Sequence, residues 1–233
     1  MAIRAVLFDV GGPLDTEVLS EAIVDRQIGE ALAACGVEVD QDAIAMASDW
    51  AVAAFAPDAY RAMIWRLSGG DAARAEEVFR LFRAGADARY AERGGFELRP
   101  GIPELLGALH GRGLLLGLAA NQYARAIDEL DRHGIGQYFA HREVSGHHGY
   151  RKPDVRLFLR ACEDLEVEPG ECLMIGDRVD NDIAPARLLG MRTVLLRAGR
   201  HIAQQPRSFD EVPDFEVRTV EEMRNAIWRL LAG

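Results

Sequence analysis

The sequence predicts an α/β fold, in which a Rossmann-like core with a parallel sheet is interrupted after its first strand by an all-helical insert. Two observations predict it. In the second half of the chain, short apolar segments alternate with amphipathic helical ones, as is typical of parallel sheets. Between residues 17 and 93 the pattern is helical and rich in alanine, and it contains no good strand pattern.

The expected core elements begin with a strand at residues 3–8, an apolar run that ends at Asp9. After the insert we expect helices and strands in alternation. The helices are residues 102–111, 124–133, 154–165, 183–189 and 220–231, and the strands are residues 114–119, 139–144 (weak), 172–175 and 193–196. Residues 1–15 and 96–233 should therefore form the α/β core.

Glycine and proline residues divide the insert into four expected helices, because these residues end helical segments. The breaks fall at Gly36, at Pro57, at Gly69-Gly70 and at Gly94-Gly95. The expected helices are residues 17–35, 40–55, 57–67 and 71–92. Residues 16–95 should therefore fold as a separate helical domain.

Composition limits the classes of partner. The 233 residues carry a formal net charge of −10, which gives no sign of a basic face for nucleic acid. The longest apolar runs fall far short of the ~20 residues that a membrane span needs. Three scattered cysteines argue against a disulfide framework. We expect a cytoplasmic protein, monomeric or homodimeric, without nucleic-acid or membrane partners.

Polar residues follow several of the expected strands. Asp9 and Asp177 come directly after strands, and Asn121 lies just past another. Ligands of such sheets bind beyond the carboxyl ends of the strands, so we expect these side chains to converge. Lys152 lies in a loop that should reach the same edge.

The segment "GDRVDND", residues 176–182, concentrates negative charge. Asp177, Asp180 and Asp182 lie within six residues, where they repel one another unless a cation or solvent separates them. Mg²⁺ prefers such oxygen ligands, and together with Asp9 the segment predicts a magnesium site. In the alternative interpretation Asp182 caps the following helix and Asp180 is merely solvated.

Lys152 is the only lysine in the chain, beside 26 arginines. Since this sequence uses arginine for surface cations, a surviving lysine indicates a need for a compact ammonium group. Such a group neutralises a carboxylate and a phosphate together. The alternative is an ordinary solvated lysine.

Four signals occur in a fixed order: Asp9, Asn121 after a strand, Lys152-Pro153, and Gly176-Asp177 followed by Asp182. This order resembles the haloacid dehalogenase (HAD) superfamily over nearly the whole chain. The helical insert is similar to that family's small helical cap, and the acid-rich segment resembles its Mg²⁺-dependent phosphatase branch.

The resemblance implies that Asp9 attacks phosphorus and forms an aspartyl-phosphate, which water then hydrolyses. It implies Mg²⁺ bound by the carboxylates of Asp9 and Asp177 and by the backbone carbonyl of Gly11. Lys152 would neutralise charge, and Asp182 would support the metal site or Lys152. We expect Asn121 and Arg178 to contact the substrate, although Arg178 is equally placed to pair with Asp180.

Two residues depart from the family's pattern. Gly11 stands where its phosphatases usually carry an acid–base aspartate, a group typically worth ~10²–10⁴-fold in rate. Ala120 stands where a serine or threonine usually donates to the phosphoryl group, a loss of ~1.5–3 kcal/mol. His147 or His148 is a candidate substitute proton donor, although a loop histidine is more often solvated.

The sequence therefore predicts a HAD-like hydrolase, a Mg²⁺-dependent phosphohydrolase of a small phosphorylated metabolite, slowed by Gly11 and Ala120. One alternative is a catalytically silent metal- or metabolite-binding protein of the same fold. A less favoured alternative is a 2-haloacid dehalogenase-type enzyme, because uncompensated carboxylates would repel an anionic haloacid.

Overall fold

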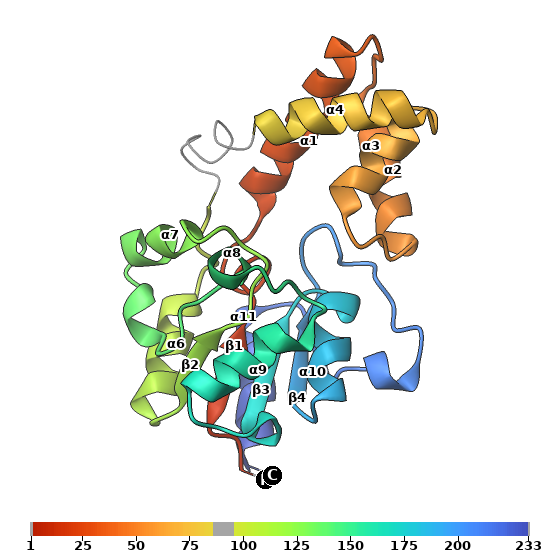
Figure 1. Cartoon of the computed structure of the whole chain (residues 1–233). Coiled ribbons are helices and arrows are strands. Elements are labelled where there is room, and N and C mark those ends of the chain that lie inside the picture. The colour runs from red at the N-terminus through yellow and green to blue at the C-terminus, as the bar shows by residue number, and fades with distance from the viewer. Residues whose placement is uncertain (1, 86–95, 233) are drawn as a thin grey trace. The chain divides into compact units, whose positions relative to one another are not determined.

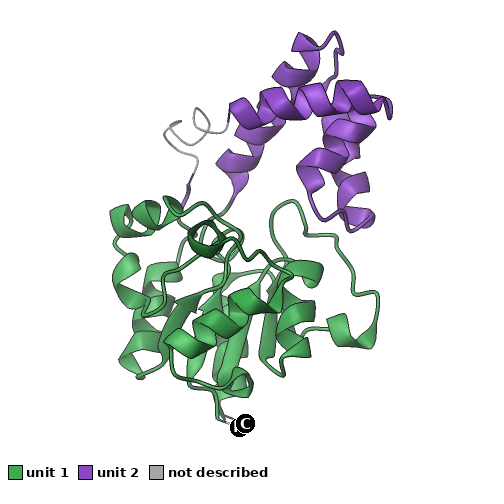
Figure 2. Ribbon diagram, in the orientation of Figure 1, with its two compact units in different colours: residues 1–16, 98–233 green, residues 17–97 purple. Residues whose placement is uncertain are grey.

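The computed structural model describes residues 2–85 and 96–232, and it forms two compact units. The first unit contains residues 1–16 and 98–233, and the second contains residues 17–97 (Figure 2). The assignment of the second unit as a cap stays a prediction.

The first unit is built on a five-stranded sheet in which all neighbouring strands are parallel, in the order β2-β1-β3-β4-β5. The strands are β1 (Ala5–Phe8), β2 (Leu115–Leu118), β3 (Cys172–Gly176), β4 (Arg192–Leu196) and β5 (Phe215–Val217). β1 lies between β2 and β3, where Leu7 pairs with Gly117 on one side and Met174 on the other. The predicted α/β fold class is confirmed.

Helices cover both faces of this sheet (Figure 1). The longer ones are α6 (Ile102–Gly111), α7 (Ala126–Arg132), α9 (Val155–Asp164) and α11 (Val220–Ala232), and the shorter ones are α8 (Ser145–His148) and α10 (Ala184–Leu188). α9 and α10 pack together on one face, while α6 and α11 pack against each other. A strand covered on both faces is apolar throughout, and the four residues of β1 are all buried.

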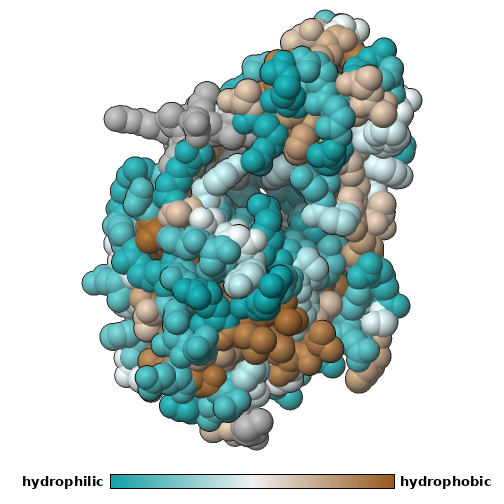
Figure 3. Space-filling view, viewed as in Figure 1, coloured by the Kyte–Doolittle hydropathy of each residue, from teal (hydrophilic) through white to brown (hydrophobic). Residues whose placement is uncertain are grey.

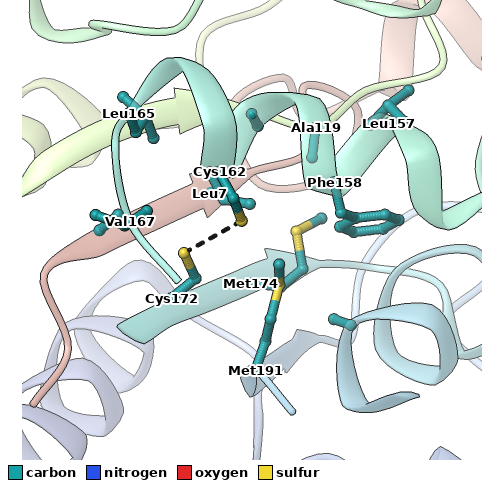
Figure 4. Packing of buried hydrophobic residues seen from close by; sticks show 13 residues of the cluster. Leu7, Ala119, Leu157, Phe158, Cys162, Leu165, Val167, Cys172, Met174 and Met191 are labelled. Carbon is teal, nitrogen blue, oxygen red and sulfur yellow. Dashed lines mark hydrogen bonds between the residues drawn. The ribbon is translucent and has the colours of Figure 1, made fainter. Parts of the chain in front are cut away.

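The core beneath α9 is an interlocked set of apolar side chains (Figure 4). Phe158 is fully buried there, and Leu7 and Met174 face it from the sheet. The Sγ atoms of Cys162 and Cys172 lie 3.6 Å apart as free thiols. The core therefore anchors β1 and β3, the two strands that end at the acidic residues of interest.

The described residues of the second unit form helices α1 (Val18–Ala34), α2 (Gln41–Ala53), α3 (Ala59–Leu67) and α4 (Ala72–Ala84). Three of them begin at an aspartate whose side chain accepts a hydrogen bond from the backbone N–H three residues on: Asp40, Asp58 and Asp71. Their apolar stripes meet around Leu32, Met63 and Val78, which are fully buried. This unit has its own hydrophobic core.

Three sequence-based expectations differ from the structure. The weak strand predicted over residues 139–144 is absent, and that segment forms only an isolated bridge between His141 and Gly117 instead of a paired strand. β5 was not expected, because it has only three residues and includes a charged Glu216. The helix expected over residues 71–92 ends at Ala84, and its last predicted residues from 86 on lie outside the described residues.

Figure 3 shows that hydrophilic side chains dominate the visible face of the first unit, with an apolar area among them. Among the residues that the structure describes, no helix combines the length and apolar character needed to cross a membrane.

We predict that Phe158→Ala lowers the free energy of unfolding by about 3–5 kcal/mol, because it removes a fully buried ring from a packed core. Leu188→Ala serves as the control, since that side chain is 79% exposed and its loss should cost less than about 0.5 kcal/mol. Urea denaturation of both variants checks the difference. Equal losses would contradict the assignment of the core.

Candidate active site

Asp9 occupies the first position after β1. Its backbone N–H donates to the carbonyl oxygen of Ile175 on β3 (2.9 Å), so the chain is still held to the sheet at this point. One carboxylate oxygen accepts from the backbone N–H of Val10 (2.7 Å), and the other faces Lys152. The sheet therefore fixes this carboxylate at its carboxyl edge.

Lys152 bridges two carboxylates. Its Nζ lies 2.8 Å from Asp9 Oδ2 and 2.6 Å from Asp182 Oδ1, and the side chain is 1% exposed. The side chain of Asn121 binds both backbone groups of Lys152: its Oδ1 accepts from Lys152 N (2.7 Å), and its Nδ2 donates to Lys152 O (3.0 Å). The amide of Asn121 therefore positions the lysine, and its predicted contact with substrate stays a prediction.

Asp182 folds the acid-rich segment back on itself. Its carboxylate is fully buried, and Oδ2 accepts from the backbone N–H groups of Asp177 (3.1 Å) and Arg178 (2.9 Å). The segment Val179–Ile183 forms a π-helical turn directly before α10. The sequence predicted the α-helix from residue 183 but not this turn. With Oδ1 bound to Lys152, the carboxylate makes three hydrogen bonds and supports both Lys152 and the turn.

Two glycines allow this close packing. A Cβ at Gly176 would lie 2.3 Å from Asp182 Cγ, and a Cβ at Gly12 would lie 2.7 Å from Asp177 Cβ. Gly12 also has a φ of 77°, which favours glycine. Its carbonyl oxygen accepts from the Nε of Arg99 (2.7 Å), which fixes the loop after β1.

Asp9, Asp177 and Asp182 offer carboxylate oxygens that lie within 4.8 Å of one another. Three carboxylates and the single ammonium of Lys152 leave this cluster with a formal charge of −2. Oxygen donors at such spacing suit a hard divalent cation. The donor set therefore fits a metal ion of the magnesium type.

Burial and neighbouring charges set the proton affinities of Asp9 and Lys152. Burial raises the pKa of Asp9 from 3.8 to about 6; the Lys152 ammonium opposes this rise and the Asp182 carboxylate adds to it. Burial disfavours the charged ammonium, but Asp182 and Asp9 outweigh it and raise the pKa of Lys152. Lys152 therefore keeps its positive charge in the site.

Arg178 pairs with Asp180, which is the alternative that the sequence left open. Its Nε lies 3.1 Å from Asp180 Oδ1 and its terminal nitrogen 2.7 Å from Oδ2, and both side chains are largely buried. Asp180 is thus neutralised and stands outside the carboxylate cluster. A substrate contact by Arg178 stays a prediction.

The residues that depart from the family's pattern also have defined places. Gly11 is buried and forms a backbone bridge with Asp15. Ala120 is fully buried, and its carbonyl oxygen accepts from the backbone N–H of Ser145 (3.0 Å). The Nδ1 atoms of His147 and His148 accept from nearby backbone N–H groups, Val144 N at 3.0 Å and Tyr150 N at 3.2 Å. A proton-donating role for either histidine is untested.

Sequence reasoning missed the loop after β4, which carries His201 and Gln204. Both side chains are buried, and Gln204 contacts the acid-rich segment across 25 positions of sequence. Neither residue lies in a recognisable sequence pattern. Since a histidine or glutamine in a loop is usually solvated, the sequence offers no reason to expect these two to be buried.

Comparison with known proteins identifies the family. A model of haloacid dehalogenase-like hydrolases matches residues 3–190. The chain belongs to this family of hydrolases. The resemblance predicted from Asp9, Lys152 and the acid-rich segment is confirmed.

Curated relatives of this HAD-like chain are phosphatases. Glyceraldehyde 3-phosphate phosphatase of Methanopyrus kandleri is 37% identical over 114 residues, which are 49% of this chain and 47% of that protein. Phosphoserine phosphatase of Thermus thermophilus is 32% identical over 161 residues, 67% of this chain and 59% of that protein. The chain thus spans about half the length of the curated relatives it matches.

Solved structures share the fold over nearly the whole HAD-like chain. A predicted phosphoglycolate phosphatase from Haemophilus somnus superposes with a TM-score of 0.74 at 19% identity, covering 97% of this chain and 98% of that one. A putative HAD-hydrolase from Bacillus subtilis, bound to magnesium, gives a TM-score of 0.67 at 19% identity with 99% coverage of both chains. At these identities the likeness shows the fold alone.

His201 is a buried imidazole near Arg178, Asp180 and Arg200. Its Nδ1 has no hydrogen-bond partner among the described residues. Burial lowers its pKa from 6.5 to about 3; Arg178 and Arg200 lower it further, and Asp180 opposes them. The folded protein therefore holds this ring neutral, whereas the unfolded chain takes up a proton below about pH 6.5.

We predict that His201 lowers the free energy of unfolding by about 1–2 kcal/mol as the pH drops from 7 to 5, against the opposite contribution of Asp9, whose pKa is raised. A lowered pKa in the folded state means that the unfolded state binds more protons over this range. His201→Leu should therefore lose less stability between pH 7 and pH 5 than the wild type. Urea denaturation at both pH values measures the slope, and identical slopes would contradict the prediction.

Proposed function

We propose that this HAD-like chain is a Mg²⁺-dependent phosphohydrolase that works through an aspartyl-phosphate on Asp9. The observation that carries the proposal is the buried contact of Lys152 with Asp9 beside the carboxylate of Asp177. The phosphatase relatives support it. We also propose that the helical unit, residues 17–97, serves as the cap that selects the substrate.

The charge of the cluster supports a divalent metal. A formal charge of −2 would repel a phosphate dianion, so substrate binding requires an added cation. When bound by the carboxylates of Asp9 and Asp177 and the carbonyl of Gly11, Mg²⁺ would supply positive charge at the phosphoryl oxygens. Asp182, whose carboxylate already makes three hydrogen bonds, holds Lys152 and the turn in place; direct binding of the metal by Asp182 is the alternative.

The reaction divides into two displacements at phosphorus. A carboxylate oxygen of Asp9 forms a bond to phosphorus, and the bond from phosphorus to the substrate's oxygen breaks. The leaving alcohol takes its proton from water. Water then attacks the phosphorus of the aspartyl-phosphate, and the bond from phosphorus to Asp9 breaks. Inorganic phosphate leaves with one proton of this water, and the water's other proton passes to solvent. Lys152 neutralises the Asp9 carboxylate and the phosphoryl group throughout.

Gly11 and Ala120 make both displacements slow for ordinary esters. Neither side chain donates a proton or a hydrogen bond, so leaving groups that need no protonation should react best. Acyl and aryl phosphates belong to this class. The matched relatives act on small phosphorylated metabolites, glyceraldehyde 3-phosphate and phosphoserine by name, and we propose a small phosphorylated metabolite for this chain as well.

We predict Mg²⁺-dependent hydrolysis of p-nitrophenyl phosphate that Asp9→Asn abolishes. Gly11→Asp should raise steady-state turnover about 10²–10⁴-fold, because an aspartate at this position would supply the base that the second displacement lacks, a step that the good leaving group does not accelerate. Gly12, and not Gly11, has the left-handed φ, so the backbone conformation at residue 11 does not require glycine. Release of p-nitrophenolate measures all three proteins.

Two other outcomes separate the remaining functions. No turnover in wild type but recovery in Gly11→Asp would show a silent binding protein on an intact scaffold. Metal-independent release of halide from a 2-haloacid would support the dehalogenase alternative. No turnover by any of the three proteins would contradict the phosphatase proposal.

We further predict that acetyl phosphate and Mg²⁺ leave a long-lived phosphate on Asp9. Attack by Asp9 on this activated phosphate needs no acid, whereas hydrolysis of the product lacks its base. Intact-protein mass spectrometry should show one phosphate adduct in wild type and none in Asp9→Asn. A wild type that remains unmodified would rule out the slow second displacement.

A further inference from the structure

Gln204 is a buried side chain in the loop after β4, with an exposed fraction of 2%. Its amide makes two hydrogen bonds to the acid-rich segment. The Oε1 atom accepts from the backbone N–H of Val179 (2.7 Å), and the Nε2 atom donates to Asp180 Oδ1 (3.0 Å). One side chain thus holds two consecutive residues of the segment that carries Asp177 and Asp182.

The N–H of Val179 needs this partner. It belongs to the first residue of the π-helical turn, and the first N–H groups of a helical turn have no partner within it. The preceding N–H groups, those of Asp177 and Arg178, are bound by the Asp182 carboxylate. Gln204 therefore continues a series of side-chain acceptors that fixes the backbone between residues 177 and 179.

Gln204 is itself anchored to the edge of the sheet. Its backbone N–H donates to the carbonyl oxygen of His201 (2.9 Å), and its own carbonyl oxygen accepts from the guanidinium of Arg197. Arg197 pairs with Glu216 on β5, with nitrogen–oxygen distances of 3.1 and 2.7 Å. Its backbone N–H also donates to Val217 (2.7 Å). A continuous set of contacts thus runs from β5 to the acid-rich segment.

Asp180 is the second point at which Gln204 holds the acid-rich segment. Its carboxylate is held by Arg178 on one side and by Gln204 on the other, and it takes no part in the carboxylate cluster. Two neighbouring acids of the segment therefore differ in their use: Asp182 holds Lys152, whereas Asp180 ties the segment to the loop after β4.

We propose that Gln204 is a positioning residue for the metal site, acting through Val179 and Asp180 to hold Asp177 against Asp9. This role rests on the proposed function. Residues that orient metal ligands through hydrogen bonds typically contribute about 10–100-fold to metal affinity. Loss of both hydrogen bonds frees the backbone that carries Asp177, so the metal must then order it on binding.

The test compares Gln204→Met, which keeps the size of the side chain but loses both hydrogen bonds, with wild type. Gln205→Leu is the matched control, because Gln205 is the adjacent glutamine and is exposed. Mn²⁺ is the probe, and electron paramagnetic resonance of the free ion measures its binding. We expect about 10–100-fold weaker Mn²⁺ binding in Gln204→Met and an unchanged affinity in Gln205→Leu.

Kinetics with p-nitrophenyl phosphate separate positioning from a general loss of structure. In Gln204→Met the Mg²⁺ concentration for half-maximal rate should rise by the same factor, while kcat at saturating Mg²⁺ stays within about twofold of wild type. If Gln204→Met does not fold, Gln204→Glu carries the test, because its carboxylate still accepts from Val179 but repels Asp180, and it too should bind Mn²⁺ more weakly.

Equal Mn²⁺ affinity in wild type and the folded Gln204 variants would overturn the positioning role and leave the proposed function standing. A lowered kcat at saturating Mg²⁺ with unchanged Mn²⁺ affinity would also overturn it. If wild type binds no Mn²⁺, the proposed Mg²⁺-dependent function itself fails, and the role of Gln204 fails with it.

Discussion

The shared contact of one ammonium group with two carboxylates is the interaction on which the site depends. Lys152 lies between Asp9 and Asp182, and its side chain and that of Asp182 are almost entirely shielded from water. At such burial an unpaired carboxylate is costly, so the three groups require one another. They come from the end of β1, the loop before α9 and the turn after β3, and the contact therefore joins three separate segments of the chain.

Contacts with the backbone hold the charged side chains of the site in place. Gly176 and Gly12 let two aspartates approach the chain more closely than any Cβ would allow. Asp182 binds backbone N–H groups, and Asn121 binds both the N–H and the carbonyl of Lys152. Local polar contacts of this kind hold charged side chains in fixed places, which is what reaction by positioning and electrostatics requires.

Much of the fold and part of the site could be predicted from the sequence. Apolar runs and the glycine or proline breaks placed most helices and four of the five strands, because buried parallel strands and helix ends have strong local patterns. Asp9 contacts Lys152 and lies near Asp177, as the rule for carboxyl ends predicts. β5 and the roles of Gln204 and His201 could not be predicted, since a three-residue strand and contacts between distant loops leave no local pattern.

The sequence also left Arg178 and Asp182 with two interpretations each. For Arg178 the geometry shows the ion pair with Asp180. For Asp182 the geometry shows the contact with Lys152 and not a cap of the following helix, because the second carboxylate oxygen accepts from N–H groups that precede it in the chain. A cluster of acids in the sequence predicts that their charge must be balanced. The three-dimensional contacts show that Arg178 balances Asp180 and that Lys152 balances Asp182.

The single lysine has a further consequence for chemical labelling. The chain has no other lysine, and its remaining permanently charged cations are arginines, so apart from the N-terminal amine it offers amine-directed reagents only the Nζ of Lys152. That atom is shielded from water and held by two carboxylates. Acylation at Lys152 would therefore report how often the interior of the site opens to solvent, without any introduced probe.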